Sequence, residues 1–297
     1  MRKGLTEIVF ILDRSGSMRG LEADTIGGFN SMIERQQKEE GEAFLSTILF
    51  DDETEVLYDR VPLDKVEPMY DRQYYVRGCT ALLDAVGGAI HHIGNVHKYA
   101  RPDDVPEKTL FIITTDGMEN ASRRYDYRRV KEMVERQQKK YNWEFIFVGA
   151  NIDAISVAGK FGVSASRAVR FENDGMGAEL NYKVMSDMVS CARSAKSARR
   201  MSEVFESGAM LSEIRADYEE YEECAASDAE VDFDEDDREA IEGIFSKLSS
   251  REQSIAKAIF GLGGEIAHTV PETSRMVNLQ EGRVRQMAEK IKRKAGR

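Results

Sequence analysis

The sequence predicts a doubly wound α/β fold, with a mostly parallel sheet and one antiparallel edge hairpin, followed by a small all-α helix-turn-helix domain. Short, nearly continuous apolar runs are typical of strands that are buried on both faces of a parallel sheet. Three such runs occur, at Ile8–Leu12, Leu110–Thr114 and Glu144–Val148. Segments with a helical period lie between them, and only helical patterns occur from about residue 237 onward.

The remaining elements of the α/β part follow in chain order. Two further β-rich runs flank Asp51-Asp52-Glu53 and are typical of an antiparallel hairpin, with strands over Phe44–Phe50 and Thr54–Tyr58. Helical patterns fall at about 22–38, 82–98, 126–140 and 178–194. Strands that alternate with helices imply right-handed crossovers, which place helices on both faces of the sheet. In this architecture ligands bind beyond the carboxyl ends of the strands.

Length and charge divide the chain into three parts. Its 297 residues are enough for two domains. We expect an α/β domain over 1–195, an acidic linker with some marginal helix over 196–236 and a helical domain over 237–297. The linker has few large apolar residues, and thirteen carboxylates lie between Asp217 and Glu239. Basic residues outnumber acidic ones from Arg251 onward, so the net charge of −11 is an average over segments of opposite charge.

Composition excludes several classes of protein. The apolar run near the N-terminus is much shorter than the roughly 20 residues that a bilayer requires. It is not followed by the small-residue cleavage site of a signal peptide. Cys79, Cys191 and Cys224 have no spacing typical of a metal or redox motif. We therefore expect a reduced, cytoplasmic protein.

The most informative motif is Asp13-Arg14-Ser15-Gly16-Ser17, which directly follows the first strand. It places one carboxylate and two hydroxyls on a tight loop, where Gly16 lets the backbone turn. Thr80, in a loop that opens a helix, and Asp116, at a strand end, belong to segments that reach the same edge of the sheet. These hard oxygens carry only two formal charges, which favours Mg²⁺, with Mn²⁺ as the alternative, over Zn²⁺. The five expected metal ligands are Asp13, Ser15, Ser17, Thr80 and Asp116.

This arrangement resembles the metal-ion-dependent adhesion site (MIDAS) of von Willebrand factor A domains. That family's pattern is Asp-x-Ser-x-Ser followed by a distant Thr and a distant Asp, and all five positions are present in this sequence. The resemblance covers roughly residues 5–195, including the hairpin and the order of the elements. It implies binding rather than catalysis, because the open position of such a metal takes a carboxylate from a partner protein. The alternative is that these residues cap loops in a metal-free relative.

Other chemistries have less support among the residues. An enzyme of the haloacid dehalogenase type also has an Asp after its first strand, but it needs a second acid two residues on, where Ser15 stands. No nucleophile is paired with a base, so we expect no enzymatic activity. His91, His92 and His97 point in three directions around a helix and are not expected to converge on a metal.

The C-terminal part carries a second motif. Thr269 to Glu272 forms a capping box that opens a short helix, and Asn278 suits a tight turn because it tolerates a positive φ. With the basic amphipathic helix that follows, these elements make a helix-turn-helix. Six side chains of this last helix are expected to face DNA: Arg283, Arg285, Gln286, Lys290, Arg293 and Lys294. The alternative is a solvated basic face on a helical protein-binding domain.

This segment, over about 237–297, is similar to region four of housekeeping-type bacterial sigma factors. The similarity rests mainly on Arg283-Val284-Arg285-Gln286 and on the Phe-Gly-Leu-Gly-Gly turn at 260–264. It implies contact with promoter DNA and with the flap of RNA polymerase. Gly282 stands where the family has a base-contacting Glu, and Glu281 replaces an Arg that reaches DNA. DNA binding of modest or altered specificity, dominated by phosphate contacts, is therefore expected.

Together these features predict a Mg²⁺-dependent protein-binding module that is linked to a DNA- or RNA-polymerase-binding tail in a transcription-associated regulator. The alternative is a substrate-recruiting adaptor of a hexameric ATPase, whose tail is a helical docking domain. The acidic segment over 217–239 allows one further hypothesis. It either masks the basic helix or the metal site, or acts as a solvated spacer.

Overall fold

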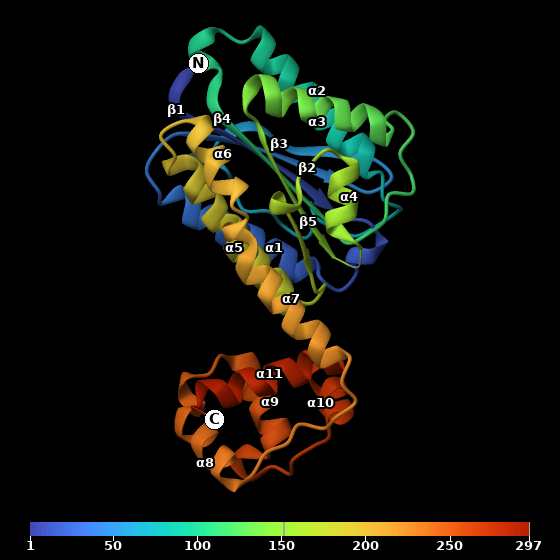
Figure 1. Ribbon diagram of the computed structural model, residues 1–297, viewed down its shortest axis with the longest axis vertical. Helices are drawn as coiled ribbons and strands as arrows, with labels where there is room; N and C mark the ends of the chain where they lie inside the picture. Colours follow the sequence, from blue (N-terminus) through green and yellow to red (C-terminus); the bar gives the residue numbers. More distant parts are fainter. Residues whose placement is uncertain (151, 297) are drawn as a thin grey trace. The chain divides into compact units, whose positions relative to one another are not determined.

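The computed structural model describes residues 1–150 and 152–296, which form two compact units, Met1–Arg215 and Ala216–Arg297. We call these unit 1 and unit 2 and describe each by itself. Figure 1 shows the elements in chain order. The division falls within one helix, α7. None of the helices in the described residues is long and apolar enough to cross a membrane.

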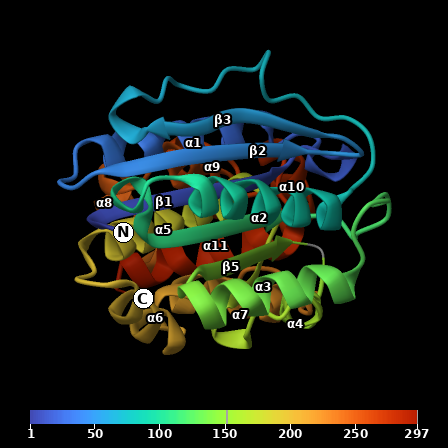
Figure 2. The ribbon, with the colours of Figure 1, turned by 90° about the horizontal axis from the view of Figure 1, so that it is seen from above.

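Unit 1 is built on a six-stranded sheet with the order β3-β2-β1-β4-β5-β6 (Figure 2). β2 and β3 pair antiparallel, and the other neighbours pair parallel. The mostly parallel sheet with one antiparallel edge hairpin is therefore confirmed. The strands are β1 (Arg2–Asp13), β2 (Ala43–Phe50), β3 (Thr54–Pro62), β4 (Pro106–Thr115), β5 (Glu144–Ala150) and β6 (Ala168–Phe171).

Seven helices belong wholly or partly to unit 1 within the described ranges. The four predicted ones are present as α1, α2, α3 and α5. The short α4 and strand β6 were not predicted, because a few residues carry no recognisable period. The helices are α1 (Glu22–Gln37), α2 (Leu82–Tyr99), α3 (Tyr127–Tyr141), α4 (Ala154–Lys160), α5 (Gly175–Ser194), α6 (Ala198–Glu206) and α7 (Ser212–Ala225).

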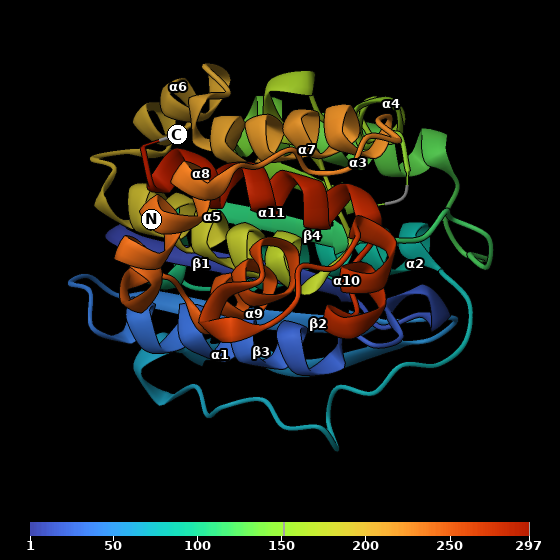
Figure 3. The same ribbon diagram turned by 90° about the horizontal axis from the view of Figure 1, so that it is seen from below.

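The apolar residues of β1 explain why helices cover both faces of the sheet. Successive side chains of a strand point to opposite faces. Ile8, Phe10 and Leu12 join the core that includes residues of α1 and α5, which pack side by side (Figure 3). Val9 and Ile11 join the core that includes residues of α2, α3 and α4. The central strand is thus buried on both sides, and its carboxyl end is the place where functional side chains can emerge.

The segment predicted as an acidic linker, 196–236, is mostly ordered helix. Met201, Phe205, Leu211 and Ile214 are at most 1% exposed and belong to the core of unit 1. Met201 and Phe205 are four residues apart and so lie on one side of α6, while Leu211 lies in the turn before α7 and Ile214 at the start of α7. The α/β unit consequently extends to Arg215 rather than ending near residue 195.

Unit 2 is helical. It contains the end of α7 and the helices α8 (Glu235–Ile244), α9 (Ser250–Phe260), α10 (Val270–Val277) and α11 (Glu281–Lys294). The capping box is confirmed. The Thr269 hydroxyl accepts a hydrogen bond from the backbone amide of Glu272, and the Glu272 carboxylate accepts one from the backbone amide of Thr269. Asn278 has a φ of 52°, as the predicted turn requires. A short helix, a tight turn and a longer helix are therefore present.

Candidate metal centre

Backbone hydrogen bonds bring the loop after β1 next to the loop that precedes α2. The amide of Gly16 donates to the Gly78 carbonyl at 3.2 Å, and the amide of Arg77 donates to the Arg14 carbonyl at 2.9 Å. The carbonyl of Thr80 accepts from two amides of the segment after β4, at 3.0 and 3.3 Å. The three segments that carry the predicted ligands therefore meet at the carboxyl edge of the sheet.

Asp13 is deeply buried, with an exposed fraction of 1%. Its Oδ1 accepts from the Ser15 amide at 2.7 Å, and its Oδ2 accepts from the Thr115 hydroxyl at 2.6 Å. The Tyr74 hydroxyl donates to its backbone carbonyl at 2.6 Å. Burial raises the pKa of Asp13 above its usual value, although the bonds from Ser15 and Thr115 oppose the shift.

The three hydroxyls lie around the same point. Ser15 Oγ and Ser17 Oγ are 3.0 Å apart. A Cβ atom built on Gly117 would lie 2.7 Å from Thr80 Oγ1 and 3.2 Å from Ser17 Oγ. The hydroxyls of Ser17 and Thr80 thus both border the space next to Gly117, which a larger residue would fill. The structure brings together the donors that the sequence placed on three separate segments.

Asp116 has an unsatisfied charge. Burial and repulsion from Asp13 together raise its pKa to about 6, although the Ser17 hydroxyl opposes the shift. Its Oδ1 is buried and has no hydrogen-bond partner among the described residues. A buried carboxylate oxygen without a partner is costly unless something else compensates it. A small cation held by two carboxylates and three hydroxyls would do so, and these residues therefore fit such an ion.

Asn173, in the loop between β6 and α5, was missed from the sequence. Its Nδ2 donates to Asp116 Oδ2, and its own Oδ1 is buried without a partner among the described residues. The only available signal was its position just beyond a strand at the same edge of the sheet, and β6 itself was not predicted. Asn173 orients the second carboxylate of the candidate centre.

The histidines do not gather around a metal. His92 lies 2.8 Å from Asp59, His97 lies 3.2 Å from Glu7, and His91 accepts from the neighbouring Asn95. Within residues 1–150 and 152–296, no group of three or more His, Cys, Asp or Glu side chains lies in a metal-binding arrangement. The candidate centre contains only two carboxylates, so its hydroxyls are essential to it. Cys79, beside Thr80, is exposed.

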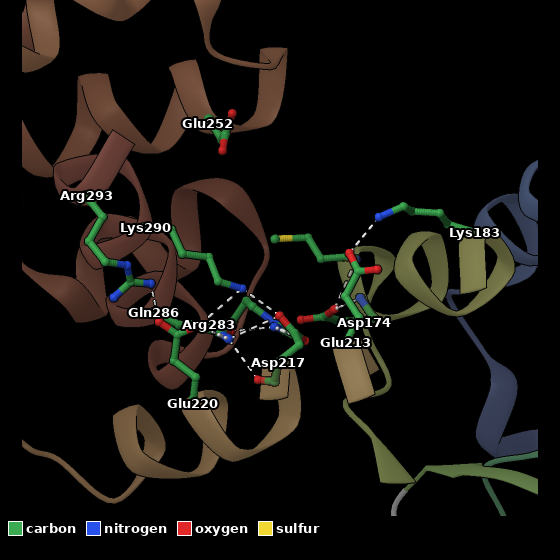
Figure 4. Close-up of polar contacts among 12 residues, drawn as sticks. Asp174, Lys183, Glu213, Asp217, Glu220, Glu252, Arg283, Gln286, Lys290 and Arg293 are labelled. Carbon is green, nitrogen blue, oxygen red and sulfur yellow. Dashed lines mark hydrogen bonds and ion pairs between the residues drawn. The ribbon is translucent and has the colours of Figure 1, made fainter. Parts of the chain in front are cut away.

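The structure does not place the predicted DNA-binding residues of α11 on an open face; their side chains are buried or paired within unit 2. Arg283 and Gln286 are completely buried in unit 2. Asp217 of α7 accepts from Arg283 at 2.9 Å, from Lys290 at 2.6 Å and, through its backbone carbonyl, from Gln286 at 2.8 Å (Figure 4). The sequence did not predict the burial of Arg283 and Gln286, because the pattern of one helix does not show which of its faces another helix will cover.

The other three basic side chains also have partners within unit 2. Arg285 donates to the Ala229 carbonyl at 2.8 Å and is 9% exposed. Arg293 pairs with Glu220, and Lys294 pairs with Glu252, although both basic side chains remain more than half exposed. The segment 217–239 therefore contacts the basic helix within unit 2, through Asp217, Glu220 and Ala229.

No protein-family model and no curated protein matches this chain. Among solved structures, it is similar to proximal thread matrix protein 1 from the mussel byssus, described with a zinc-occupied MIDAS motif (18% identity, TM-score 0.43). It is also similar to the ArnB paralog VWA2 from Sulfolobus acidocaldarius (19% identity, TM-score 0.40). A third similar structure is a von Willebrand factor type A structure from Catenulispora acidiphila (15% identity, TM-score 0.41).

These three alignments cover 64%, 63% and 66% of this chain, and 46%, 45% and 42% of the respective structures. The chain thus spans less than half the length of these solved structures. Its own strand order and register define the fold as a mostly parallel α/β sheet with one antiparallel pair and additional helices.

Proposed function

We propose that the protein is a divalent-cation-dependent protein-binding module that captures a carboxylate of a partner protein. The proposed cation is Mg²⁺, with Mn²⁺ as the alternative. The observation that carries the proposal is the buried, unpartnered Oδ1 of Asp116, which lies in a site shared with Asp13 and three hydroxyls. A bound cation would compensate the charge on this buried oxygen, which otherwise has no partner.

The donor set explains why a partner carboxylate would be the ligand. Hydroxyls are neutral, so only the charges of Asp13 and Asp116 oppose that of the ion. A bound divalent cation supplies an electrophilic centre that still attracts an external anion. Asp13, Ser15 and Ser17 would hold it from the loop after β1, while Thr80 and Asp116 would hold it from the other two segments.

Binding is also better supported than catalysis. Ser15 and Ser17 are the nucleophile candidates in the centre, and a nucleophilic serine requires an adjacent base. Three of the four histidines, His91, His92 and His97, are on α2 with partners elsewhere. We therefore assign the two serines to cation binding.

For unit 2, the burial of Arg283 and Gln286 favours a helical docking domain over a reader of DNA. This corresponds to the adaptor hypothesis, in which unit 1 recruits a substrate protein and unit 2 docks onto a hexameric ATPase. The alternative remains a tail that binds DNA or RNA polymerase, for which Arg293 and Lys294 are the more exposed cations.

Titration calorimetry of the full chain with MgCl₂ and MnCl₂ tests the metal claim. We expect saturable binding that Asp13→Ala abolishes and that Asp103→Ala, a change at an exposed aspartate outside the site, leaves intact. Equal affinity in wild type and Asp13→Ala would contradict the proposal. Affinity capture from native cells with and without Mg²⁺, using the same variants, then identifies the protein that depends on the centre.

DNA binding has its own test. Fluorescence anisotropy with a labelled duplex at low salt should show weak binding, because most basic side chains of α11 already have partners. Tight, salt-sensitive binding that Arg293→Ala and Lys294→Ala weaken would instead support the DNA-binding alternative.

A further inference from the structure

Unit 1 contains a cavity that no part of the metal centre lines. It has a volume of about 700 Å³ and lies between α2 and α3, over the first residues of β4. Cavities of roughly 300–1,000 Å³ are typical of sites for small organic molecules. The cavity walls come from both helices, and its inner wall includes Trp143.

One face of α3 provides the basic wall of this cavity. Arg129, Met133 and Arg136 are spaced by four and three residues, so they lie on the same side of the helix, and all three line the cavity. The guanidinium of Arg129 stacks on Tyr125 at 4.9 Å. Neither arginine forms an ion pair with a carboxylate within the described residues.

The opposing charge in the cavity is small. Glu107 is the acidic residue among those that line it, and its Oε2 already accepts from the Gly4 amide at 2.8 Å. Lys98 of α2 adds a further cation to the lining. Arg129, Arg136 and Lys98 are exposed, so these positive charges lie where the cavity opens to solvent and attract anions. Guanidinium groups suit acid groups because they donate two parallel hydrogen bonds to two of the acid's oxygens.

The inner wall is aromatic and contains an unsatisfied acceptor. Trp143 is 4% exposed and stacks on Phe111, with ring centroids 5.3 Å apart. Gln137 Oε1 is buried and has no hydrogen-bond partner among the described residues, although its residue lines the cavity. Because this oxygen is closed to solvent, Gln137 lines the cavity through its other atoms.

Gly94 of α2 keeps the space open. A Cβ atom at this position would make only ordinary contacts, 3.4 Å from Gln137 Nε2 and 4.0 Å from Trp143 Cη2. Its φ is not in the left-handed region, so a larger residue suits the helix backbone there. The side chain of a larger residue would therefore occupy the cavity without straining α2.

We propose that this cavity binds a small organic anion with a flat apolar body. Arg129 and Arg136 bind the acid group, and Trp143 and Met133 contact the flat body. The site is independent of the metal centre, since none of the five proposed cation ligands lines it.

The probe for this site is 8-anilinonaphthalene-1-sulfonate, which has a sulfonate, aromatic rings and an N–H group. Its neutral counterpart, N-phenyl-1-naphthylamine, lacks the sulfonate. Fluorescence titration of the folded full chain should show one saturable site for the anionic probe. We expect its affinity to fall at least about tenfold in the double variant Arg129→Gln/Arg136→Gln, while the affinity of the neutral probe changes little.

Two further variants separate the site from the fold. Gly94→Leu should remove binding of both probes while the far-ultraviolet circular dichroism spectrum is retained. Lys139→Gln, an exposed change elsewhere on α3, should leave binding unchanged. Unchanged affinity of the anionic probe in Gly94→Leu would overturn the site, and unchanged affinity in the double arginine variant would overturn the assignment of an anion.

Discussion

Gly282 of α11 and Ala225 of α7 are in backbone contact. A Cβ atom built on Gly282 would lie 2.8 Å from Ala225 Cα and 2.7 Å from Ala225 Cβ. Two helices approach this closely only where one of them lacks a side chain. About two turns earlier on α7, Asp217 bonds Arg283 and Lys290. The position that departs from the sigma-factor pattern is thus the point where α7 packs on α11.

Gly282→Ala tests this contact. Alanine is about 1 kcal/mol better than glycine inside a helix, but here its methyl group would overlap Ala225 and cost about 1–3 kcal/mol through overpacking. We expect a net loss in the free energy of unfolding of unit 2, measured by urea denaturation. Gly243→Ala is the matched control, since a Cβ atom on this α8 glycine meets no other group within 4 Å, and it should stabilise. Equal stabilisation by both changes would contradict the packing.

The ion pairs of Asp217 predict a dependence of stability on pH. The charges of Arg283 and Lys290 hold the pKa of Asp217 below its usual value, against the opposing effect of burial. A carboxyl group with a lowered pKa stabilises the fold above its unfolded pKa, and this contribution is lost as the pH falls through its folded pKa. The lost stability should therefore appear below about pH 4.

Asp217→Asn is the variant for this prediction. It removes the charge opposite Arg283, whose side chain is fully buried, and should cost about 3 kcal/mol near neutral pH. The difference from wild type should shrink on acidification, as followed by urea denaturation at several pH values. Glu219→Gln, at an exposed position of the same helix, should have little effect. A difference that stays constant with pH would show that charge is not the cause.

Asp116→Asn should separate the stability of unit 1 from its cation binding. The amide removes a buried charge whose pKa is raised to about 6. Since solvent reduces the full effect of this shift, we expect a gain of roughly 1 kcal/mol without metal near neutral pH. The rise in melting temperature on adding Mg²⁺ should be lost. If the variant still gains stability from Mg²⁺, Asp116 is not a ligand.

Asn173→Ala tests the residue that positions Asp116. Removal of the amide frees Asp116 Oδ2 from its bond to Nδ2. Partners that orient metal ligands typically contribute 10–100-fold to metal affinity, so calorimetry should show a loss of about tenfold or more for Mg²⁺. The melting temperature without metal should change little, because the variant also removes the buried Asn173 Oδ1, which has no partner among the described residues. If the melting temperature without metal fell strongly and the Mg²⁺ affinity stayed the same, Asn173 would stabilise the fold without positioning a metal ligand.

Much of unit 1 was predictable because its signals are local. The continuous apolar run from Ile8 to Leu12 is typical of a strand buried on both faces, and Asp51-Asp52-Glu53 separates two β-rich runs that pair as a hairpin. Asp13 and Asp116 could be placed at one edge of the sheet because each comes at the end of a parallel strand, and parallel strands end on the same side. Thr80 could be placed there because its loop opens a helix at that edge. Asn173 escaped prediction because it follows a strand of only four residues.

The sequence by itself determined the longer strands and helices, the Thr269 capping box and the candidate oxygen donors, since periodicity, capping and strand-end residues act over a few positions. Only the tertiary structure decided which charges are buried. Arg283 looks like a surface cation on an isolated helix, but it is enclosed because Asp217, far away in sequence, supplies a carboxylate at 2.9 Å. Desolvation and pairing of charge depend on such distant contacts, which no local pattern encodes.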